Sequence, residues 1–333
     1  MFCAEKRSSE FSQTILFASD ISRSGIKNKE TRYESTIISQ KPLNFRSEKQ
    51  AMKSVVITGA STGIGKSAAI LLSEMGWQVF AGVRKESDAN ELVRISGGKI
   101  QPIQLEVTDA ESIKAAAALI ESKCKELNGL VNNAGIVVAA PLEFVPMEDL
   151  RKQFEVNVIG QIAVTQAFLP MLRKSKGRVI NVGSVSGIFA TPFTGPYCAS
   201  KFAMEAMSDA LRMELKPWDI EVSLIQPGSI ATPIWEKSMS AAESLEKRMP
   251  ARAFELYRKA IDAVKITSQK TAAKGIPAEA VADVIYEALT VRKPKTRYLV
   301  GKDARTYQWL LRLFSDRFRD KLVLKQMRLW DLK

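Results

Sequence analysis

The stretch Thr58-Gly59-Ala60-Ser61-Thr62-Gly63-Ile64-Gly65 follows the apolar run Val55-Val56-Ile57 and opens into the helix-forming run from Lys66 to Leu72. A short apolar run before a glycine turn is typical of a buried parallel strand. The three glycines suit, in order, a tight turn, a close approach of the backbone to a phosphate, and packing of the helix on the sheet. Because backbone N–H groups and the helix dipole then face an anion, this pattern predicts a pyrophosphate site. The alternative, an ordinary strand-to-helix turn, does not need three glycines.

The chain around this turn alternates apolar runs with amphipathic helical patterns. Such alternation predicts a parallel sheet whose strands are joined by right-handed crossovers. We therefore expect an α/β fold, a doubly wound Rossmann-type sheet of about seven strands in one domain. Strands are expected near 54–58, 78–83, 100–105, 129–132, 178–183, 220–226 and 297–300. Helices are expected near 63–75, 88–95, 110–126, 147–174, 196–215 and 278–290.

Polar side chains follow two further apolar strands at the point where each strand ends. Asn132-Asn133-Ala134-Gly135 comes after Leu130-Val131, and Asn181-Val182-Gly183-Ser184 comes after Arg178-Val179-Ile180. In an open α/β sheet, ligands bind beyond the carboxyl ends of the strands. We therefore expect both segments to converge with the glycine turn on one crevice, although asparagine and serine are also common turn residues.

Tyr197 and Lys201 lie four residues apart in Tyr197-Cys198-Ala199-Ser200-Lys201, which places them on one face of a helix. An ammonium beside a phenol favours the phenolate, so Lys201 is expected to lower the phenol pKa from about 10. A tyrosine tuned in this way can pass a proton to or from a substrate oxygen near neutral pH. Alone, this pair is a common chance match on an amphipathic helix. The glycine turn and the two strand ends make it informative.

With these motifs in this order, the chain resembles the short-chain dehydrogenase/reductase family from about Met52 to about Asp303. The resemblance is carried by TGxxxGIG at Thr58 to Gly65, NNAG at Asn132 to Gly135, Asn157, Ser184, YxxxK at Tyr197 and Lys201, and Pro227-Gly228 followed by Thr232. It implies an oxidoreductase that moves a hydride between a nicotinamide cofactor and an alcohol/carbonyl pair. One departure is Glu106-Val107, where many members have Asp-Val in the adenine pocket.

The resemblance implies a catalytic role for each of four residues. Tyr197 is the general acid/base, and Lys201 lowers its pKa and binds the nicotinamide ribose. Ser184 hydrogen-bonds the substrate oxygen, and Asn157 holds a water that feeds protons to Lys201. The alternative for Asn157 is helix packing, and for Ser184 it is a turn. The implied cofactor-binding residues are Thr58, Gly59, Ser61, Gly63, Ile64, Gly65, Arg84, Glu106, Val107, Asn133, Ala134, Gly135, Tyr197, Lys201, Pro227, Gly228, Ile230 and Thr232.

Cofactor choice depends on the end of the second expected strand, where Val83 is followed by Arg84. An acidic residue at this strand end would bind a ribose 2′-hydroxyl and repel a 2′-phosphate. The guanidinium of Arg84 instead suits a phosphate, which favours NADP(H) over NAD(H). The alternative is that Arg84 is a solvated loop charge and either cofactor is used. Thr62, inside the glycine turn, adds no second charge.

Three stretches look like the hydroxysteroid and retinol dehydrogenase branch: Val79 to Lys85, Tyr197 to Ala203, and Tyr298 to Ala304. This likeness implies a bulky lipophilic small-molecule substrate. Two other classes are kept as alternatives: an NADP(H)-binding regulatory protein with little turnover, and a protein that acts at a membrane surface. Homo-oligomers are common in the family, so a homo-oligomer is expected by analogy.

The composition of the 333 residues limits the chemistry. The absence of histidine excludes a Ser–His triad and any histidine-ligated metal, and the three unpaired cysteines argue against a zinc site. We therefore expect no metal site. Most of the net charge of +13 comes from residues 292–333. This placement indicates a basic C-terminal appendage on a nearly neutral core, and no nucleic-acid partner is expected.

Three segments stand outside the sheet pattern. Residues 1–51 read as a disordered tail or a targeting or upstream extension, which leaves organelle targeting open. The cysteine usage favours a reducing compartment, so we expect a cytoplasmic protein. The core domain is expected at 52–303, with 233–275 as a substrate lid or a surface excursion. Residues 304–333 predict one basic amphipathic helix in which Tyr307, Leu311, Phe314, Phe318 and Leu322 share a face. It is expected either to dock on protein or to contact a membrane through 304–330.

Overall fold

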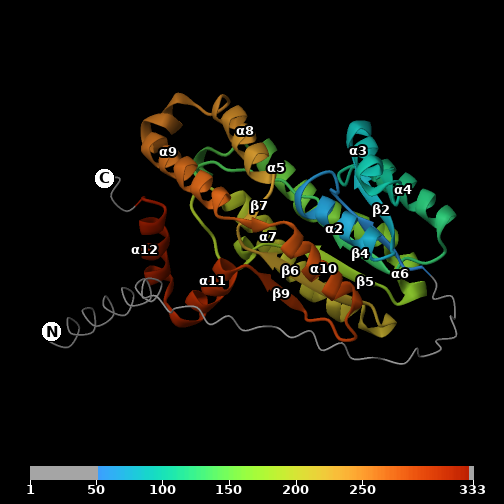
Figure 1. Ribbon diagram of the computed structural model, residues 1–333. Helices are drawn as coiled ribbons and strands as arrows, with labels where there is room; N and C mark the ends of the chain where they lie inside the picture. The colour runs from blue at the N-terminus through green and yellow to red at the C-terminus, as the bar shows by residue number, and fades with distance from the viewer. Residues whose placement is uncertain (1–51, 330–333) are drawn as a thin grey trace, which may run out of the picture. The chain divides into compact units, whose positions relative to one another are not determined.

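The computed structural model describes residues 52–329, apart from the side chains of Tyr307 and residues 309–312. The predicted tail or extension at 1–51 lies outside the described residues. The core is a seven-stranded parallel sheet in the order β3-β2-β1-β4-β5-β6-β9, which confirms the expected Rossmann-type α/β fold (Figure 1). The strands are β1 (Ser54–Ile57), β2 (Gln78–Val83), β3 (Ile100–Gln104), β4 (Gly129–Asn132), β5 (Arg178–Val182), β6 (Glu221–Pro227) and β9 (Arg297–Val300).

The strand order reverses between β1 and β4, in the middle of the sheet. Ile57 of β1 lies beside Ala81 of β2 on one side and beside Val131 of β4 on the other. The chain leaves β1 toward β2 and leaves β4 toward β5, so the two connections diverge. A crevice opens where connections diverge, at the carboxyl ends of the strands. The glycine turn after β1 and the NNAG segment after β4 therefore lie side by side at this crevice.

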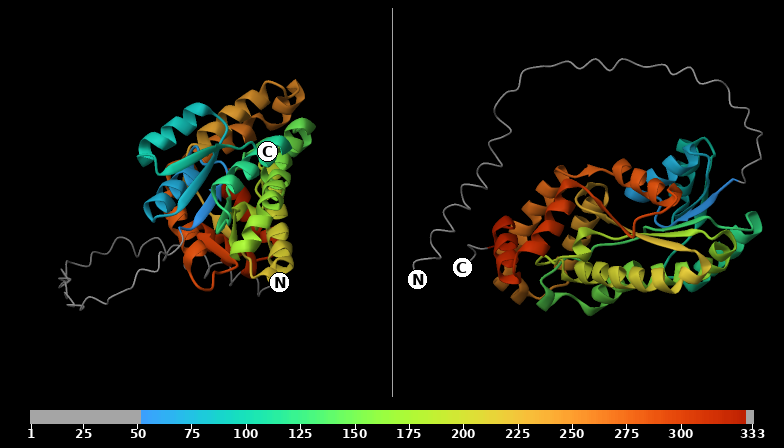
Figure 2. Two further views of the ribbon diagram at one scale, coloured as in Figure 1. Left: turned by 90° about the vertical axis from the view of Figure 1, so that its right-hand side faces the viewer. Right: turned by 90° about the horizontal axis from the view of Figure 1, so that it is seen from below.

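Helices cover both faces of the sheet (Figure 2). Because successive residues of a strand point to opposite faces, Val55 and Ile57 belong to one apolar core and Val56 belongs to the other. The first core is covered by α2 (Gly63–Glu74), α3 (Glu86–Ser96) and α10 (Glu279–Thr290). The second is covered by α4 (Ala110–Lys123), α6 (Gly160–Ser175) and α7 (Gly195–Glu214).

The helix expected over 147–174 contains an interruption. It consists of α5 (Met147–Phe154), a π-helical turn η2 (Glu155–Ile159) and α6. The helix passes close to the loop after β3 here, since a Cβ on Gly160 would lie 2.5 Å from the carbonyl oxygen of Val107. A π turn adds one residue to a helical turn and re-aims the side chains in it. Asn157 lies in this turn and is buried.

The segment predicted as a lid forms two helices, α8 (Ile234–Glu246) and α9 (Ala251–Ala273). A two-stranded parallel pair, β7 (Ile230–Ala231) and β8 (Ile276–Pro277), closes the base of this excursion. Leu245, Met249 and Ile261 form a third apolar cluster with residues 138–145 of the loop after β4. The excursion therefore packs on the same loop that carries the NNAG segment.

The single helix predicted over 304–330 is wrong, because the structure has two helices there. They are α11 (Lys302–Leu313) and α12 (Asp316–Gln326), separated at Phe314 and Ser315. Ser315 is extended, with φ −65° and ψ 157°, and Asp316 begins the next helix. Serine and aspartate compete with helical hydrogen bonding and are favoured at helix starts, which explains the break. The Phe314 and Phe318 rings of the predicted face stack across the break, with centroids 4.5 Å apart.

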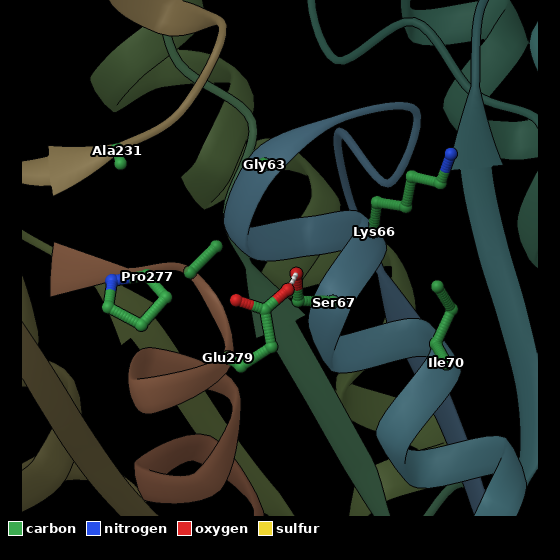
Figure 3. A pocket seen from close by; sticks show the side chains of 8 residues that line it. Gly63, Lys66, Ser67, Ile70, Ala231, Pro277 and Glu279 are labelled. Carbon is green, nitrogen blue, oxygen red and sulfur yellow. Dashed lines mark hydrogen bonds between the residues drawn. The ribbon is translucent and has the colours of Figure 1, made fainter.

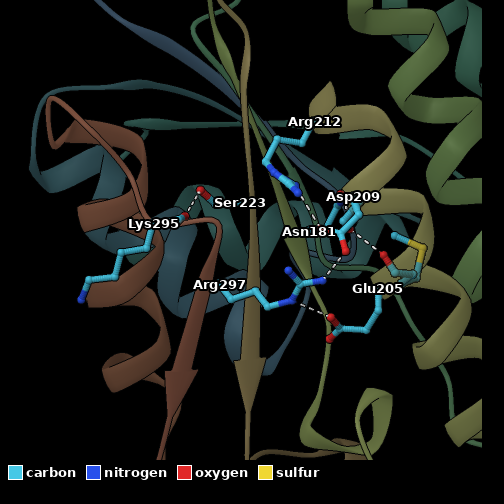
Figure 4. A network of polar contacts seen from close by, with 9 residues as sticks. Asn181, Glu205, Asp209, Arg212, Ser223, Lys295 and Arg297 are labelled. Atoms are coloured by element: carbon cyan, nitrogen blue, oxygen red, sulfur yellow. Dashed lines mark hydrogen bonds and ion pairs between the residues drawn. The ribbon is translucent and has the colours of Figure 1, made fainter. Parts of the chain in front are cut away.

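A polar network attaches the edge strand β9 to α7 (Figure 4). Arg297 of β9 donates to Glu205 at 2.9 Å and to Asp209 at 2.7 Å, and both carboxylates belong to α7. Gln226 of β6 donates to the other oxygen of Glu205 at 2.7 Å. Hydrogen bonds to Arg297 hold the pKa of Asp209 below its usual value. Since α7 also carries Tyr197 and Lys201, this network fixes the helix of that pair to the sheet.

Replacing Arg297 with alanine should lower the free energy of unfolding by about 1–3 kcal/mol, because Glu205 would stay largely buried without its charged partner. Urea denaturation would measure the change. Lys176→Ala is the matched control, since the Lys176–Asp219 pair is exposed and screened by solvent, so its loss should change stability little. Equal losses in the two variants would mean that the network does not stabilise the fold.

Candidate active site

The glycine turn after β1 forms a cradle with no room for side chains. Gly59 has φ +63°, and a Cβ there would lie 2.8 Å from Cα of Ala134. Gly63 has φ +57°, and a Cβ there would lie 3.1 Å from the side chain of Thr232. Both positions therefore favour glycine for backbone strain and for space. The cradle at the N-terminus of α2 fits the pyrophosphate of a dinucleotide.

Thr58 and Asn133 clasp the ends of β1 and β4 together. The Thr58 hydroxyl oxygen accepts from the backbone N–H groups of Asn133 and Ala134, both at 2.9 Å. The Asn133 amide donates to the carbonyl oxygens of Thr58 at 2.9 Å and Gly59 at 3.0 Å. These bonds set the position of the glycine turn. Thr58 acts behind the cradle and does not line the cleft.

Three buried amides at four-residue spacing hold the loop at 134–138. Asn157 accepts from the N–H of Ile136 at 2.9 Å and donates to its carbonyl oxygen at 3.0 Å. Gln153 accepts from the N–H of Val138 at 2.7 Å, and Gln161 donates to Ala134. Gln153 and Gln161 were not predicted from the sequence. Their spacing from Asn157 along the expected helix was the signal that could have identified them.

Asn157 also contacts α7, because its amide donates to the Ser200 hydroxyl at 3.1 Å. Both polar ends of its side chain therefore have protein partners. The expected water held by Asn157 stays a prediction, and its side chain does not need that water to be satisfied. In this structure Asn157 joins the loop after β4 to the helix that carries the catalytic pair.

Ser184, Tyr197 and Lys201 come together at the carboxyl end of β5. Ser184 follows this strand and is buried. Lys201 lies under the Tyr197 ring, with its ammonium nitrogen 5.7 Å from the ring centroid. That nitrogen donates to the carbonyl oxygen of Val182 at 2.8 Å. The structure therefore gathers the three residues whose grouping the sequence predicted.

The pKa values of the pair differ from the expectation of a lowered phenol pKa. Burial raises the pKa of Tyr197 to about 12, although a hydrogen bond with Ser184 opposes the rise. Burial lowers the pKa of Lys201 to about 8. The expected effect of Lys201 on the phenol is overridden because both groups are desolvated and the ammonium is directed to Val182. In the free protein Tyr197 is therefore a protonated donor at neutral pH.

One cleft of about 600 Å³ joins the glycine turn to the catalytic residues. Thr58, Gly65 and Asn157 lie behind its wall, and the other predicted site residues line it. These lining residues are Gly59, Ser61, Gly63, Ile64, Arg84, Glu106, Val107, Asn133, Ala134, Gly135, Ser184, Tyr197, Lys201, Pro227, Gly228, Ile230 and Thr232. Glu106 accepts from the hydroxyl of Thr108 at 3.1 Å and faces Arg84 at 3.4 Å.

Asp303 also lines the cleft and was not predicted as a site residue. Its carboxylate accepts from the backbone N–H of Ser229 at 2.7 Å and fills the space beside Gly228, where a Cβ would overlap it. Asp303 therefore holds the Pro-Gly loop after β6 in place. The signal that could have identified Asp303 is its place in the stretch Tyr298 to Ala304, which resembles a branch of the family.

Comparisons with known proteins agree with this geometry. Residues 53–243 match the family model described as short chain dehydrogenase, and the chain belongs to the short-chain dehydrogenase/reductase family of NAD(P)-dependent oxidoreductases acting on CH–OH groups. It is 36% identical over 284 residues to NADPH-dependent 3-dehydrocapnine reductase of Ornithobacterium rhinotracheale, covering 83% of this chain and 98% of the relative.

Two further relatives are named for two different substrates. Rat mitochondrial D-beta-hydroxybutyrate dehydrogenase is 35% identical, covering 82% of this chain and 84% of the relative. Human retinol dehydrogenase 5 is 36% identical, covering 77% and 82%. Among solved structures, a Burkholderia cenocepacia short chain dehydrogenase in complex with NADP has a TM-score of 0.62 and 26% identity, covering 84% of this chain and 98% of that chain.

The residues of the cleft can carry the family's reaction in simple steps. When bound in this cleft, a nicotinamide cofactor would supply or accept the hydride. When a carbonyl is reduced, negative charge develops on its oxygen, and the hydroxyls of Ser184 and Tyr197 are positioned to donate to it. Tyr197 would then give its proton to that oxygen. The Lys201 ammonium, which donates to the carbonyl oxygen of Val182, would stabilise the phenolate that remains, and the steps would reverse for oxidation.

For carbonyl reduction, kcat/KM should fall as pH rises through about 8, because Lys201 loses its proton there while Tyr197, with a pKa of about 12, stays protonated. A pH–rate profile with saturating carbonyl and limiting cofactor would measure this. Lys201→Arg keeps its charge over the same range, so its residual activity should not fall near pH 8. A flat profile to pH 10 in the unmodified protein would contradict the assigned role of Lys201.

Proposed function

We propose that the protein is an NADP(H)-dependent alcohol dehydrogenase or carbonyl reductase for a lipophilic substrate. The apolar lining of the cleft that contains Tyr197 carries this proposal. Aromatic and aliphatic side chains from separate segments gather there: Phe193 before α7, Met239 on α8, Ile261 and Val264 on α9, and Met327 at the end of α12. Surface of this kind favours an apolar substrate, which is desolvated when it binds.

The relatives alone leave the substrate class open. One is named for retinol, a lipophilic alcohol, and another for hydroxybutyrate, a small polar hydroxy acid. We choose between these two substrate classes from the residues that line the cleft. A small hydroxy acid would leave the partly buried side chains of Phe193, Met239 and Met327 uncovered, whereas a long or polycyclic carbonyl compound could cover them.

A series of 2-alkanones tests the lipophilic substrate with NADPH oxidation as the assay. Each added methylene that is buried contributes about 0.8 kcal/mol, so kcat/KM should rise roughly three- to fourfold per carbon until the cleft is filled. Tyr197→Phe should abolish turnover at every chain length while NADPH binding persists. Faster reduction of acetoacetate than of the long ketones would contradict the lipophilic substrate.

NADP(H) is the proposed cofactor because Arg84 lines the cleft directly after β2, where NAD(H)-binding proteins use an acid. The Arg84 side chain lies 3.4 Å from Glu106. Because it is 70% exposed, it can turn from that carboxylate toward a phosphate. Solved relatives include complexes with NADP and with NAD, which leaves the choice to this chain's own residues.

Arg84→Asp should weaken NADPH binding roughly tenfold and strengthen NADH binding, because a charged hydrogen bond to phosphate is replaced by repulsion. Titration of each cofactor into the variant would give both dissociation constants. Arg94→Asp is the control, since Arg94 pairs with Glu91 on the surface of α3. An unchanged NADPH/NADH ratio in the Arg84 variant would show that another residue discriminates.

We also propose peripheral membrane contact through 304–330, with the substrate entering from the lipid. The exposed surface there combines Leu313 and Phe318 with the basic side chains of Arg317, Lys321 and Lys325. Val323 and Met327 of the same segment line the cleft. A basic and apolar surface beside a cleft entrance favours anionic lipid. Within residues 52–329, no helix has the length and apolarity needed to span a bilayer.

Reversing the charges of Lys321 and Lys325 to glutamate should reduce pelleting with anionic liposomes, and salt should reduce pelleting of the unmodified protein. The matched control reverses Lys114 and Lys123, two exposed lysines on α4. Both variants keep α12 and its contribution to the cleft, unlike a truncation. If the α12 and α4 variants pellet equally with the liposomes, the membrane contact is elsewhere or absent.

A further inference from the structure

Lys237 reaches from α8 to the glycine turn. Its ammonium nitrogen donates to the hydroxyl oxygen of Thr62 at 3.0 Å, across 175 positions of sequence. Both residues line the cofactor cleft. Within residues 52–329, Lys237 has no carboxylate at ion-pair distance, so its positive charge is not neutralised by the protein.

Thr62 occupies the N-cap position of α2 but does not cap the helix. Its hydroxyl makes no hydrogen bond to the first N–H groups of α2, and the first turn carries no acidic residue. Threonine at this position normally satisfies one of those donors. Here the Thr62 hydroxyl instead accepts from Lys237. The first backbone N–H groups of α2 are therefore left to bind an anionic ligand.

The other lysine near this helix start is directed elsewhere. Lys66 extends away from Glu279 in Figure 3, and its ammonium lies 3.6 Å from Glu91. A smaller cavity of about 310 Å³ adjoins this side of α2, and Glu279 projects into it and accepts from Ser67 at 3.1 Å. A carboxylate there disfavours an anion. The positive charge at the start of α2 is therefore supplied on the cleft side, by Lys237.

We propose that Lys237 is a phosphate-binding residue of the cofactor site, supplied by α8. It provides the cation that Thr62 does not supply within the turn, and it complements Arg84 on the other side of the cleft. The chemistry recognised is a phosphoryl oxygen of the dinucleotide, in either the pyrophosphate or the 2′-phosphate. The inference rests on the proposed use of this cleft for NADP(H).

Lys237→Gln tests the inference by direct titration of NADPH and of NADH into the full-length protein, without substrate. Binding of NADPH should weaken about tenfold, and higher salt should reduce the difference between variant and unmodified protein. Lys237→Arg should retain most of the affinity. Lys247→Gln removes the same charge from the exposed end of α8 and should leave both affinities unchanged.

The pattern of losses identifies the phosphate. A loss for NADPH alone assigns Lys237 to the 2′-phosphate, and equal losses for NADPH and NADH assign it to the pyrophosphate. Unchanged affinities for both cofactors, with a melting temperature equal to that of the unmodified protein, would overturn the inference while leaving the proposed function intact. Failure of the unmodified protein to bind NADPH would instead overturn the proposed cofactor.

Discussion

The clasp between Thr58 and Asn133 is the constraint on which the site depends. Parallel strands β1 and β4 end side by side, and the chain leaves them in opposite directions. Without cross-links, the two loops at this point would be free to separate. One hydroxyl accepting from two backbone N–H groups, and one amide donating to two carbonyl oxygens, close the gap. The glycine cradle, the loop at 134–138 and the cleft beneath them all take their positions from these bonds.

Much of this arrangement could be predicted because it depends on local sequence. The period of the apolar runs specified the seven strands, and glycines with positive φ at 59 and 63 specified the turn. The grouping of Ser184, Tyr197 and Lys201 followed from a general rule, since each lies at or beside the carboxyl end of a strand in one parallel sheet. Local pattern and global topology agree at these positions.

The remaining features depend on contacts between distant segments. The pKa order of Tyr197 and Lys201 is set by desolvation, which only the folded environment determines. The break between α11 and α12 arose where Ser315 and Asp316 favoured a new helix start over the continuing apolar period. Asp303 and Lys237 donate to or accept from loops 74 and 175 positions away, and the sequence around each residue does not show which distant loop it contacts.

The lining of the cleft by Val323 and Met327 has a consequence for biosynthesis. The cradle is encoded before residue 66, yet the last wall of the cleft is translated only with α12, near the C-terminus. The sheet itself also waits for β9, its final edge strand. A nascent chain on the ribosome therefore exposes the apolar lining until α12 has left the exit tunnel and can pack.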